Sequence, residues 1–385
     1  FRAYALRPGV TPVLHSIEKI YEAMGDNDSA MACHRGVIPE AAERQYFNAG
    51  SASEGLVKSR KASNCHHLKT HGRENLRLQL PLSNAEPATR PEFRARKTDS
   101  RGSFVSVMES AAFWFDGFNT VVVDNRQNTV EEHIKGNACL IRDVARQRPE
   151  RTVSGTVCFL DARSSSIYYH WMMDVLPKVA VLDAAGIDLG SIDYFAVHCP
   201  SEFQRETLKQ VGIPEEKLLA PWSEGLTRCT QLLVPFLKND RGDRFYNGLG
   251  LGMASWVPLW LKSVFVRSAS ARTEMLYISR ASRGSRSPRQ EQRLIQKLEQ
   301  RGIRSVTLET MTVSEQASLL SSAALVIAPH GAGLTNIAFC EVGTTVIELF
   351  DSYVVPCYWA LSELTKLDYH AYFASTPSLS TQQGS

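Results

Sequence analysis

Short apolar runs alternate with amphipathic stretches through the last third of the chain. The runs suit buried parallel strands, and the stretches between them keep their apolar residues on one helical face. A series of this kind predicts a parallel sheet with helices on both faces. The predicted order is strand 275–279, helix 288–301, strand 306–308, helix 312–320, strand 325–328, a helix from 334 and strand 345–350.

The middle of the chain carries a second series of strands and helices. Strands are predicted over 103–108 and 113–115, and Gly117 with Asn119 supplies a turn that predicts a hairpin to residues 120–124. The remaining predicted elements are strands 156–160, 193–198 and 231–236 and a capped helix over 201–211 that stops at Gly212.

A charged, glycine-containing stretch at 239–252 separates the two series and leads into a predicted linking helix over 254–266. Two α/β halves around this stretch predict two Rossmann-like domains that face a central cleft. Ligands of such sheets bind beyond the carboxyl ends of the strands. We assign residues 1–100 to a poorly readable region of loop or mobile chain, 101–250 to the first domain, 251–373 to the second and 374–385 to a polar tail.

Composition narrows the class of protein only modestly. A chain of 385 residues with a hydrophobic share of 43% is typical of a soluble protein with two domains. A net charge of +3 is too small to indicate nucleic acid or an anionic membrane as a partner. No apolar run approaches the roughly 20 residues that span a bilayer. The sequence begins with Phe1 rather than Met, so a signal or anchor upstream stays open.

The chain has eight scattered cysteines and no C-x-x-C pair. Several lie in apolar runs, such as Cys158 and Cys340, which predicts free buried thiols in a reducing compartment. His66-His67 with Cys65 and His71 lacks the spaced partner or carboxylate that would complete a metal site. Asp26-Asn27-Asp28 is typical of a solvated turn. The chain also lacks a P-loop and a G-x-G-x-x-G fingerprint, which argues against ATP hydrolysis and hydride transfer.

The turn after the strand at 325–328 is the main candidate for a ligand site. It reads His330-Gly331-Ala332-Gly333-Leu334-Thr335-Asn336. Its glycines let a ligand approach bare backbone, and the N–H groups at the start of the following helix attract an anion. An ordinary strand-to-helix turn is the alternative interpretation, because short glycine motifs are weak signals.

Charged residues near this turn fit the same interpretation. Arg280 ends the strand at 275–279 and would point at the turn, where a guanidinium matches phosphate oxygens. Arg286 lies in the loop that follows, whereas Arg283 and Arg289 are expected on a solvated surface. Glu348 interrupts an apolar strand, and a buried carboxylate needs partners. A ribose diol or a structural ion pair would each supply them.

His170 and Asp174 form the candidate catalytic pair in the other half of the chain. They are four positions apart and share a face if the stretch before Pro177 is helical. The apolar neighbours of Asp174 would raise its pKa unless it is paired. A pair of this kind suits general-base chemistry, and a purely structural hydrogen bond is the alternative.

Three groups of these residues follow one another along the chain. The first is Tyr169-His170-Trp171 followed by Asp174-x-Leu176-Pro177. The second is Tyr277-Ile278-Ser279-Arg280, with Arg286 and Glu291 behind it. The third is the 330–336 segment followed by Val346-Ile347-Glu348-Leu349. In this combination the sequence resembles glycosyltransferase family 61 over roughly residues 157–372. One departure is Gln290, which stands where an asparagine is common in the family.

The resemblance implies a GT-B-like architecture and an inverting transfer from a nucleotide-sugar, usually a UDP-sugar, without an obligatory metal or other cofactor. It assigns donor binding to Arg280, Arg286, the segment His330–Asn336 and Glu348. It places His170 and Asp174 on the acceptor side of the cleft. We expect Asp174, oriented by His170, to be the base, with the reverse assignment left open. The acceptor would be a glycan or a lipid-linked or protein-linked saccharide.

Other functions fit parts of the sequence. A non-catalytic nucleotide-sugar or glycan-binding protein would keep the turn at 330–336 without needing the His170–Asp174 pair. A nucleotide-sugar epimerase would be expected to carry the dinucleotide fingerprint. Free cysteines fit a bacterial cytoplasm, with peripheral membrane association left open, whereas a Golgi enzyme would carry an anchor upstream of Phe1.

Overall fold

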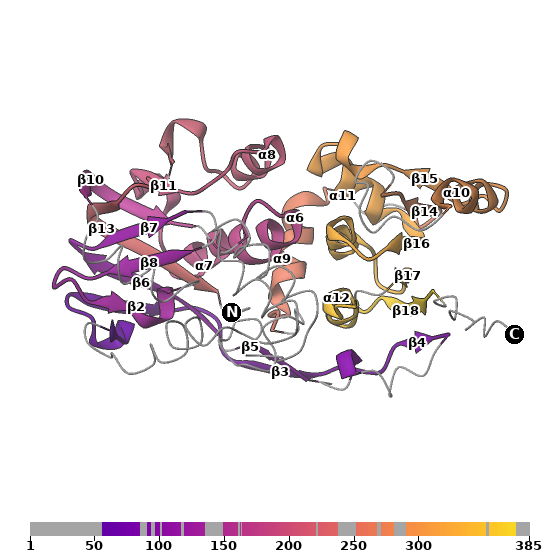
Figure 1. Cartoon of the computed structure of the whole chain (residues 1–385), viewed down its shortest axis with the longest axis horizontal. Coiled ribbons are helices and arrows are strands. Elements are labelled where there is room, and N and C mark those ends of the chain that lie inside the picture. Colours follow the sequence, from indigo (N-terminus) through magenta and orange to yellow (C-terminus); the bar gives the residue numbers. More distant parts are fainter. Residues whose placement is uncertain are drawn as a thin grey trace, which may run out of the picture.

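A computed structural model gives the protein a mixed α/β fold, with two sheets at opposite ends and most helices between them (Figure 1). The predicted α/β class is thereby confirmed. The structure describes residues 56–84, 91–93, 97–100, 102–116, 119–134, 149–160, 162, 164–220, 222–237, 252–267, 271–280, 290–351 and 354–374. The Asp26-Asn27-Asp28 turn, most of the 239–252 stretch and the polar tail lie outside these residues.

The C-terminal sheet has six parallel strands in the order β15–β14–β16–β17–β18–β4. These are β14 (Glu274–Ile278), β15 (Arg304–Val306), β16 (Ala323–Pro329), β17 (Thr345–Phe350), β18 (Asp368–Phe373) and β4 (Leu82–Ser83). Its helices are α10 (Glu291–Glu299), α11 (Val313–Ser321), the 3-10 helix η11 (Ala332–Phe339) and α12 (Cys357–Thr365). The predicted strand and helix order is confirmed, while α12 and β18 extend it. The helix predicted from residue 334 is a 3-10 helix.

The N-terminal sheet has ten strands and mixes both directions. Strand β10 (Glu150–Phe159) runs parallel to β11 (Tyr194–Ala196) and β13 (Leu226–Leu237), and β11 to β12 (Leu218–Leu219). Strands β6 (Ser103–Glu109) and β7 (Ala112–Phe115) are antiparallel to β13, and β7 forms the predicted hairpin with β8 (Thr120–Val123). The β10–β13 part therefore has the run of parallel pairings that is typical of a Rossmann-like unit, and the two-residue strands β1 (Leu56–Val57) and β9 (Thr129–Val130) also pair in parallel.

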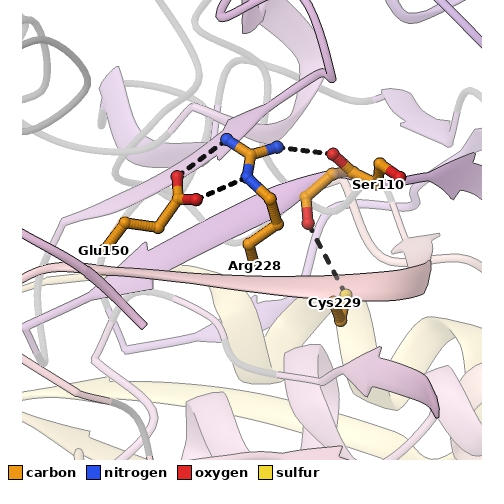
Figure 2. Close-up of polar contacts among 5 residues, drawn as sticks. Ser110, Glu150, Arg228 and Cys229 are labelled. Atoms are coloured by element: carbon orange, nitrogen blue, oxygen red, sulfur yellow. Dashed lines mark hydrogen bonds and ion pairs between the residues drawn. The ribbon is translucent and has the colours of Figure 1, made fainter. Parts of the chain in front are cut away.

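An ion pair ties the first residue of β10, Glu150, to Arg228 near the start of β13 (Figure 2). Arg228 donates from Nε to Glu150 Oε1 at 2.7 Å and from Nη2 to Oε2 at 2.8 Å. Its Nη1 donates to the Ser110 carbonyl just before β7. Because the guanidinium fork engages both carboxylate oxygens, this contact fixes the register of the two strands as well as their proximity.

Strands from the first hundred residues enter both sheets, where loop or mobile chain was predicted. Strand β2 (Cys65–Lys69) pairs with β6 in the N-terminal sheet, whereas β4 pairs with β18 at the edge of the C-terminal sheet (Figure 1). Strands β3 (Glu74–Arg77) and β5 (Lys97–Ser100) pair with each other, and β1 (Leu56–Val57) pairs with β9 (Thr129–Val130). The loop prediction was wrong for these segments because such short strands show almost no periodicity and depend on distant partners.

One hydrophobic core reaches from one sheet to the other. It includes Val105 on β6, Leu233 on β13, Leu276 on β14 and Val346 on β17. Between them lie α6 (Tyr168–His170), α7 (Lys178–Ala184), α8 (Glu202–Gln210), α9 (Trp256–Phe265) and the π-helix η6 (Trp171–Val175). Short 3-10 helices occupy Ser59–Lys61, Pro91–Phe93, Glu131–His133, Leu189–Ser191, Glu215–Lys217 and Leu308–Thr310. Because the sheets share a helical layer, the domain boundary near residue 250 stays a prediction.

The described residues contain no helix with both the length and the apolar character needed to cross a bilayer. Their cysteines are free thiols, as predicted: Cys65, Cys158, Cys199, Cys229, Cys340 and Cys357. Burial raises the pKa of the Cys158, Cys229 and Cys340 thiols, so these groups stay protonated and act as small apolar side chains.

Tyr168 and Asn336 join the helices of the two halves. The Tyr168 hydroxyl donates to Asn336 Oδ1 at 2.7 Å, and the Asn336 amide donates to Gln316 Oε1 at 2.8 Å. Burial is the main reason that the pKa of Tyr168 is raised, which keeps its hydroxyl a donor. A single hydrogen-bonded line thus connects α6, η11 and α11.

We expect Tyr168→Phe to lower the free energy of unfolding by about 1–2 kcal/mol, because it leaves a buried amide oxygen without its donor. Tyr194→Phe removes the same hydroxyl from a side chain that is 37% exposed and should change stability by less than about 0.5 kcal/mol. Denaturant unfolding of both variants measures the difference. Equal stabilities would show that the Tyr168–Asn336 contact does not hold the halves together.

Candidate functional site

The strand order of the C-terminal sheet creates a topological switch point. From β14 the chain moves to β15 on one side and then returns to β16 on the other, so β14 and β16 are neighbours. Ligands of open α/β sheets bind beyond the carboxyl ends of the strands at such a point. Arg280 follows β14 and His330 follows β16, so these two predicted site residues meet where a ligand is expected.

The Arg280 guanidinium lies directly over the glycine turn. Its Nη1 donates to the His330 carbonyl at 3.2 Å. A Cβ at position 331 would overlap Arg280 Nη1, so the guanidinium can occupy this place only when residue 331 is glycine. Backbone conformation does not impose this requirement, since Gly331 has an extended φ of 170°. The predicted closeness of arginine and turn is therefore present, and it explains the first glycine of the motif.

Glu291 holds the end of β14 in place and was not among the predicted site residues. Its Oε1 accepts from Tyr277 Oη at 2.9 Å, Ser279 Oγ at 3.2 Å and the Arg280 backbone N–H at 2.9 Å. The preceding Gln290 has a left-handed φ of 60°, a conformation that asparagine adopts more readily than glutamine. This geometry gives a physical reason why asparagine would suit position 290, where the family resemblance expects it and this chain has glutamine.

The segment after the turn offers its backbone rather than its side chains. The Leu334 N–H donates to the Gly331 carbonyl at 3.0 Å, so the amides of Ala332 and Gly333 precede the first bond of this helix. The side chains of Leu334, Thr335 and Asn336 are each about 1% exposed. Of the predicted donor residues 330–336, these three therefore face the protein interior.

His330 and Glu348 form a buried pair. His330 Nδ1 lies 2.5 Å from Glu348 Oε1, and the Tyr369 hydroxyl donates to Oε2 at 2.5 Å. Glu348 is fully buried, which raises its pKa, while the contacts with His330 and Tyr369 act in the opposite direction. Both carboxyl oxygens are occupied by side chains. This favours the structural alternative for Glu348 over a contact with ribose.

His170 and Asp174 are in direct contact, as their spacing predicted. Asp174 Oδ2 lies 2.7 Å from His170 Nδ1, and their side chains are 19% and 38% exposed. The helix changes to π geometry from Trp171, whose carbonyl accepts from the Leu176 N–H at 2.9 Å. Single π turns are frequent at functional sites because they re-aim side chains without ending the helix.

Aromatic rings connect the two candidate pairs. Tyr169 makes edge-to-face contacts with His170 at 5.3 Å and with Tyr358 at 5.7 Å between ring centroids. Tyr358 in turn lies 5.5 Å from the His330 ring. The structure thus brings the predicted residues of both halves into one neighbourhood. Sequence reasoning missed Tyr169 and Tyr358 as connectors, because aromatic residues in apolar stretches resemble ordinary core.

Some predicted features lie elsewhere or outside the described residues. Arg286 falls outside them, as do Arg283 and Arg289. His67 stacks on Phe104, and His71 stacks on Trp256 with ring centroids 4.1 Å apart. Within the described ranges, no group of three or more His, Cys, Asp or Glu side chains is arranged to hold a metal ion.

Residues 168–347 match a family model described as Glycosyltransferase 61. The matched range contains the His170–Asp174 pair, Arg280 and the 330–336 segment, while Glu348, Tyr358 and Tyr369 lie beyond it. The resemblance found in the sequence is thereby confirmed. No curated protein matches the chain.

Gly331→Ala should displace Arg280, because the added methyl group and the guanidinium cannot occupy the same space. We expect the affinity for UDP, the predicted donor nucleotide, to fall about tenfold or more, the usual effect of losing a charge-assisted contact. Titration calorimetry measures it. Gly72→Ala is the control, since a Cβ there meets no atom within 4 Å. Unchanged UDP binding in Gly331→Ala would contradict the role of this contact.

Proposed function

We propose that this member of glycosyltransferase family 61 is an inverting enzyme that transfers a sugar from a UDP-sugar to a hydroxyl of a glycan or glycoconjugate. Family membership itself implies glycosyltransferase activity, a nucleotide-sugar donor and a glycan acceptor in general. One observation carries the finer proposal. An arginine lies over the glycine turn at the switch point, and ring contacts of Tyr169 and Tyr358 connect this turn to a carboxylate–imidazole pair from the other half of the chain.

The donor side is proposed to act through fixed positive charge. Arg280 and the amides after Gly331 would face the diphosphate of the donor, and both are held before any ligand binds. Such preorganised groups stabilise the negative charge that develops on the leaving nucleotide. We therefore propose that transfer needs no resident metal ion. A GT-B-like arrangement, with the acceptor entering from the side of His170, belongs to the same proposal.

The exposure of the acceptor-side pair supports His170 as the base, which reverses the sequence-based preference for Asp174. The Asp174 carboxylate engages Nδ1 of His170, and the imidazole is the more exposed group at 38% against 19%. A carboxylate in this position orients the ring and stabilises the imidazolium that forms. His170 Nε2 would then accept the proton of the acceptor hydroxyl.

The donor, the acceptor and His170 account for every bond and proton in the proposed reaction. The acceptor oxygen forms a bond to the anomeric carbon from the face opposite the diphosphate, while the bond from that carbon to the diphosphate oxygen breaks. The hydroxyl proton moves to His170, and the nucleoside diphosphate leaves with the bonding electron pair. The transition state would have oxocarbenium character, as in glycoside hydrolysis.

Arg280→Ala should weaken UDP binding about 10- to 100-fold, because it removes the cation proposed to face the diphosphate. Arg304→Ala is the matched control, since that arginine pairs with Glu274 and is 56% exposed on β15. UDP at a hundred times its Kd should stabilise the native protein by about 2.7 kcal/mol with or without EDTA. Stabilisation by NAD and by no nucleoside diphosphate would refute the donor proposal.

His170→Gln should lower kcat about 10²- to 10⁴-fold and leave the affinity for UDP nearly unchanged, because the base acts on the acceptor. Asp174→Asn should also lower kcat, through loss of ring orientation. Asp183→Asn is the control, because Asp183 is an exposed residue on α7.

Turnover measured with a panel of UDP-sugars and saccharide acceptors shows whether His170 or Asp174 is the base. A much larger loss in Asp174→Asn would return the base role to Asp174, and UDP binding without transfer would favour a non-catalytic binding protein.

A further inference from the structure

A second carboxylate–imidazole pair lies on the donor side, and nothing in the proposed reaction uses its carboxylate. Glu348 on β17 is fully buried between His330 and Tyr369, with each oxygen 2.5 Å from its partner. His330 follows β16 directly and precedes Gly331, over which Arg280 lies. The pair therefore stands immediately behind the turn that is proposed to hold the diphosphate.

The short contact between Glu348 Oε1 and His330 Nδ1 holds a proton between these two atoms. When the pair carries two protons, one lies between these atoms and the other is on Nε2, whether the shared proton belongs to the imidazole or to the carboxyl group. Both of these arrangements give His330 an Nε2–H donor. When the pair carries only one proton, that proton lies between Nδ1 and the ionised carboxylate, and Nε2 is left with a lone pair.

We propose that Glu348 is a positioning residue that keeps two protons on the Glu348–His330 pair, so that His330 donates from Nε2 to the donor diphosphate, and that the Tyr369 hydroxyl sets the pH at which one of these protons is lost. The inference rests on the proposed function, because it assumes a diphosphate at the turn. It assigns Glu348 an indirect part in donor binding, in place of a contact with ribose. It also gives a role to Tyr369, which lies beyond the range that matches the family.

The other ionisable groups around the Glu348–His330 pair keep one charge state, so the pair is the part of this site whose protonation changes with pH. Tyr358 and Cys357 on α12 and Tyr369 on β18 have pKa values raised well above their usual ranges, chiefly by burial, so they stay neutral. Arg280, beyond β14, remains a cation. Burial raises the pKa of Glu348, and the Tyr369 hydroxyl lowers it. Removing that hydroxyl should therefore let the pair keep both protons to higher pH.

The proposal predicts a specific pH dependence of UDP binding. Affinity should be high while the pair holds both protons and should fall about tenfold or more as pH rises through the loss of one of them. Calorimetry from about pH 6 to about pH 9.5 follows this change. Dividing the UDP affinity of the native protein by that of His330→Gln at each pH cancels the effect of ionisation of the nucleotide itself, whose terminal phosphate has a pKa of about 6.

The variants separate a proton-holding role from a merely structural one. In Glu348→Gln the fall in affinity, taken as a ratio to His330→Gln, should move to lower pH, because the protonated imidazole loses the carboxylate that stabilises it. In Tyr369→Phe the fall in affinity should move to higher pH. Tyr372→Phe is the matched control on the same strand, with a side chain that is 49% exposed, and should leave the profile where it is in the native protein. An unmoved profile in Tyr369→Phe would overturn the assignment of Tyr369.

Nitrogen-15 NMR of the histidine rings tests the pair without any ligand. The His330 resonances are identified by their loss in His330→Gln, and Nε2 should be protonated at neutral pH. An unprotonated Nε2, or UDP binding with parallel profiles in native protein and His330→Gln, would overturn this inference alone. Failure of UDP to bind at every pH would instead refute the proposed donor site, and the diphosphate contact of His330 with it.

Discussion

The approach of the Arg280 guanidinium to Gly331 is the contact on which the donor side depends. It requires that the ends of β14 and β16 be neighbours, that residue 331 have no side chain and that the arginine backbone be held in place. The crossover after β15 meets the first requirement, and Glu291 meets the third. A cation is thereby fixed above exposed amides at the switch point, a position where a developing negative charge is stabilised without rearrangement.

The two carboxylate–imidazole pairs have the same chemistry and different surroundings. His170 and Asp174 are partly exposed, whereas His330 and Glu348 are 10% and 0% exposed. Exposure lets a ring exchange protons with a substrate hydroxyl, and burial makes a pair retain the proton it shares. In the proposed reaction, environment rather than residue type would therefore divide the work: His170 would accept a proton on the acceptor side, and His330 would stay a hydrogen-bond donor on the nucleotide side.

The parts of this architecture that follow from local pattern could be predicted from the sequence. Strands β14, β16 and β17 consist mostly of apolar residues, and α11 begins at a capping box formed by Thr312 and Glu315. Strand β4 could not be found, since two residues carry no period and their partner, β18, is far along the chain. The π turn at Trp171 escaped for a similar reason, because the register of its hydrogen bonds is set by packing and not by propensity.

The candidate site likewise has parts that the sequence predicts and parts that it does not. Residue type and spacing identified His170 with Asp174 and Arg280 with the glycine turn. The partners of Glu348 could not be read, because His330 and Tyr369 come from the neighbouring strands β16 and β18 and meet it only through sheet register. The reason for Gly331 was also hidden, since the sequence suggests a turn left open for a ligand whereas the structure has an extended backbone beneath an arginine.

The hydrophobic core that both sheets share fixes how the two candidate pairs lie relative to each other. The Tyr168–Asn336 hydrogen bond and the Tyr169–Tyr358 contact connect the acceptor-side pair to the donor turn through buried side chains. Separating these elements would expose apolar surface and leave buried polar groups unpaired, both of which cost free energy. The relative positions of the two pairs are therefore set by folding and not by substrate. In the proposed reaction, binding energy from the donor would then not be consumed in assembling the proposed catalytic groups, and it would be available to stabilise the transition state.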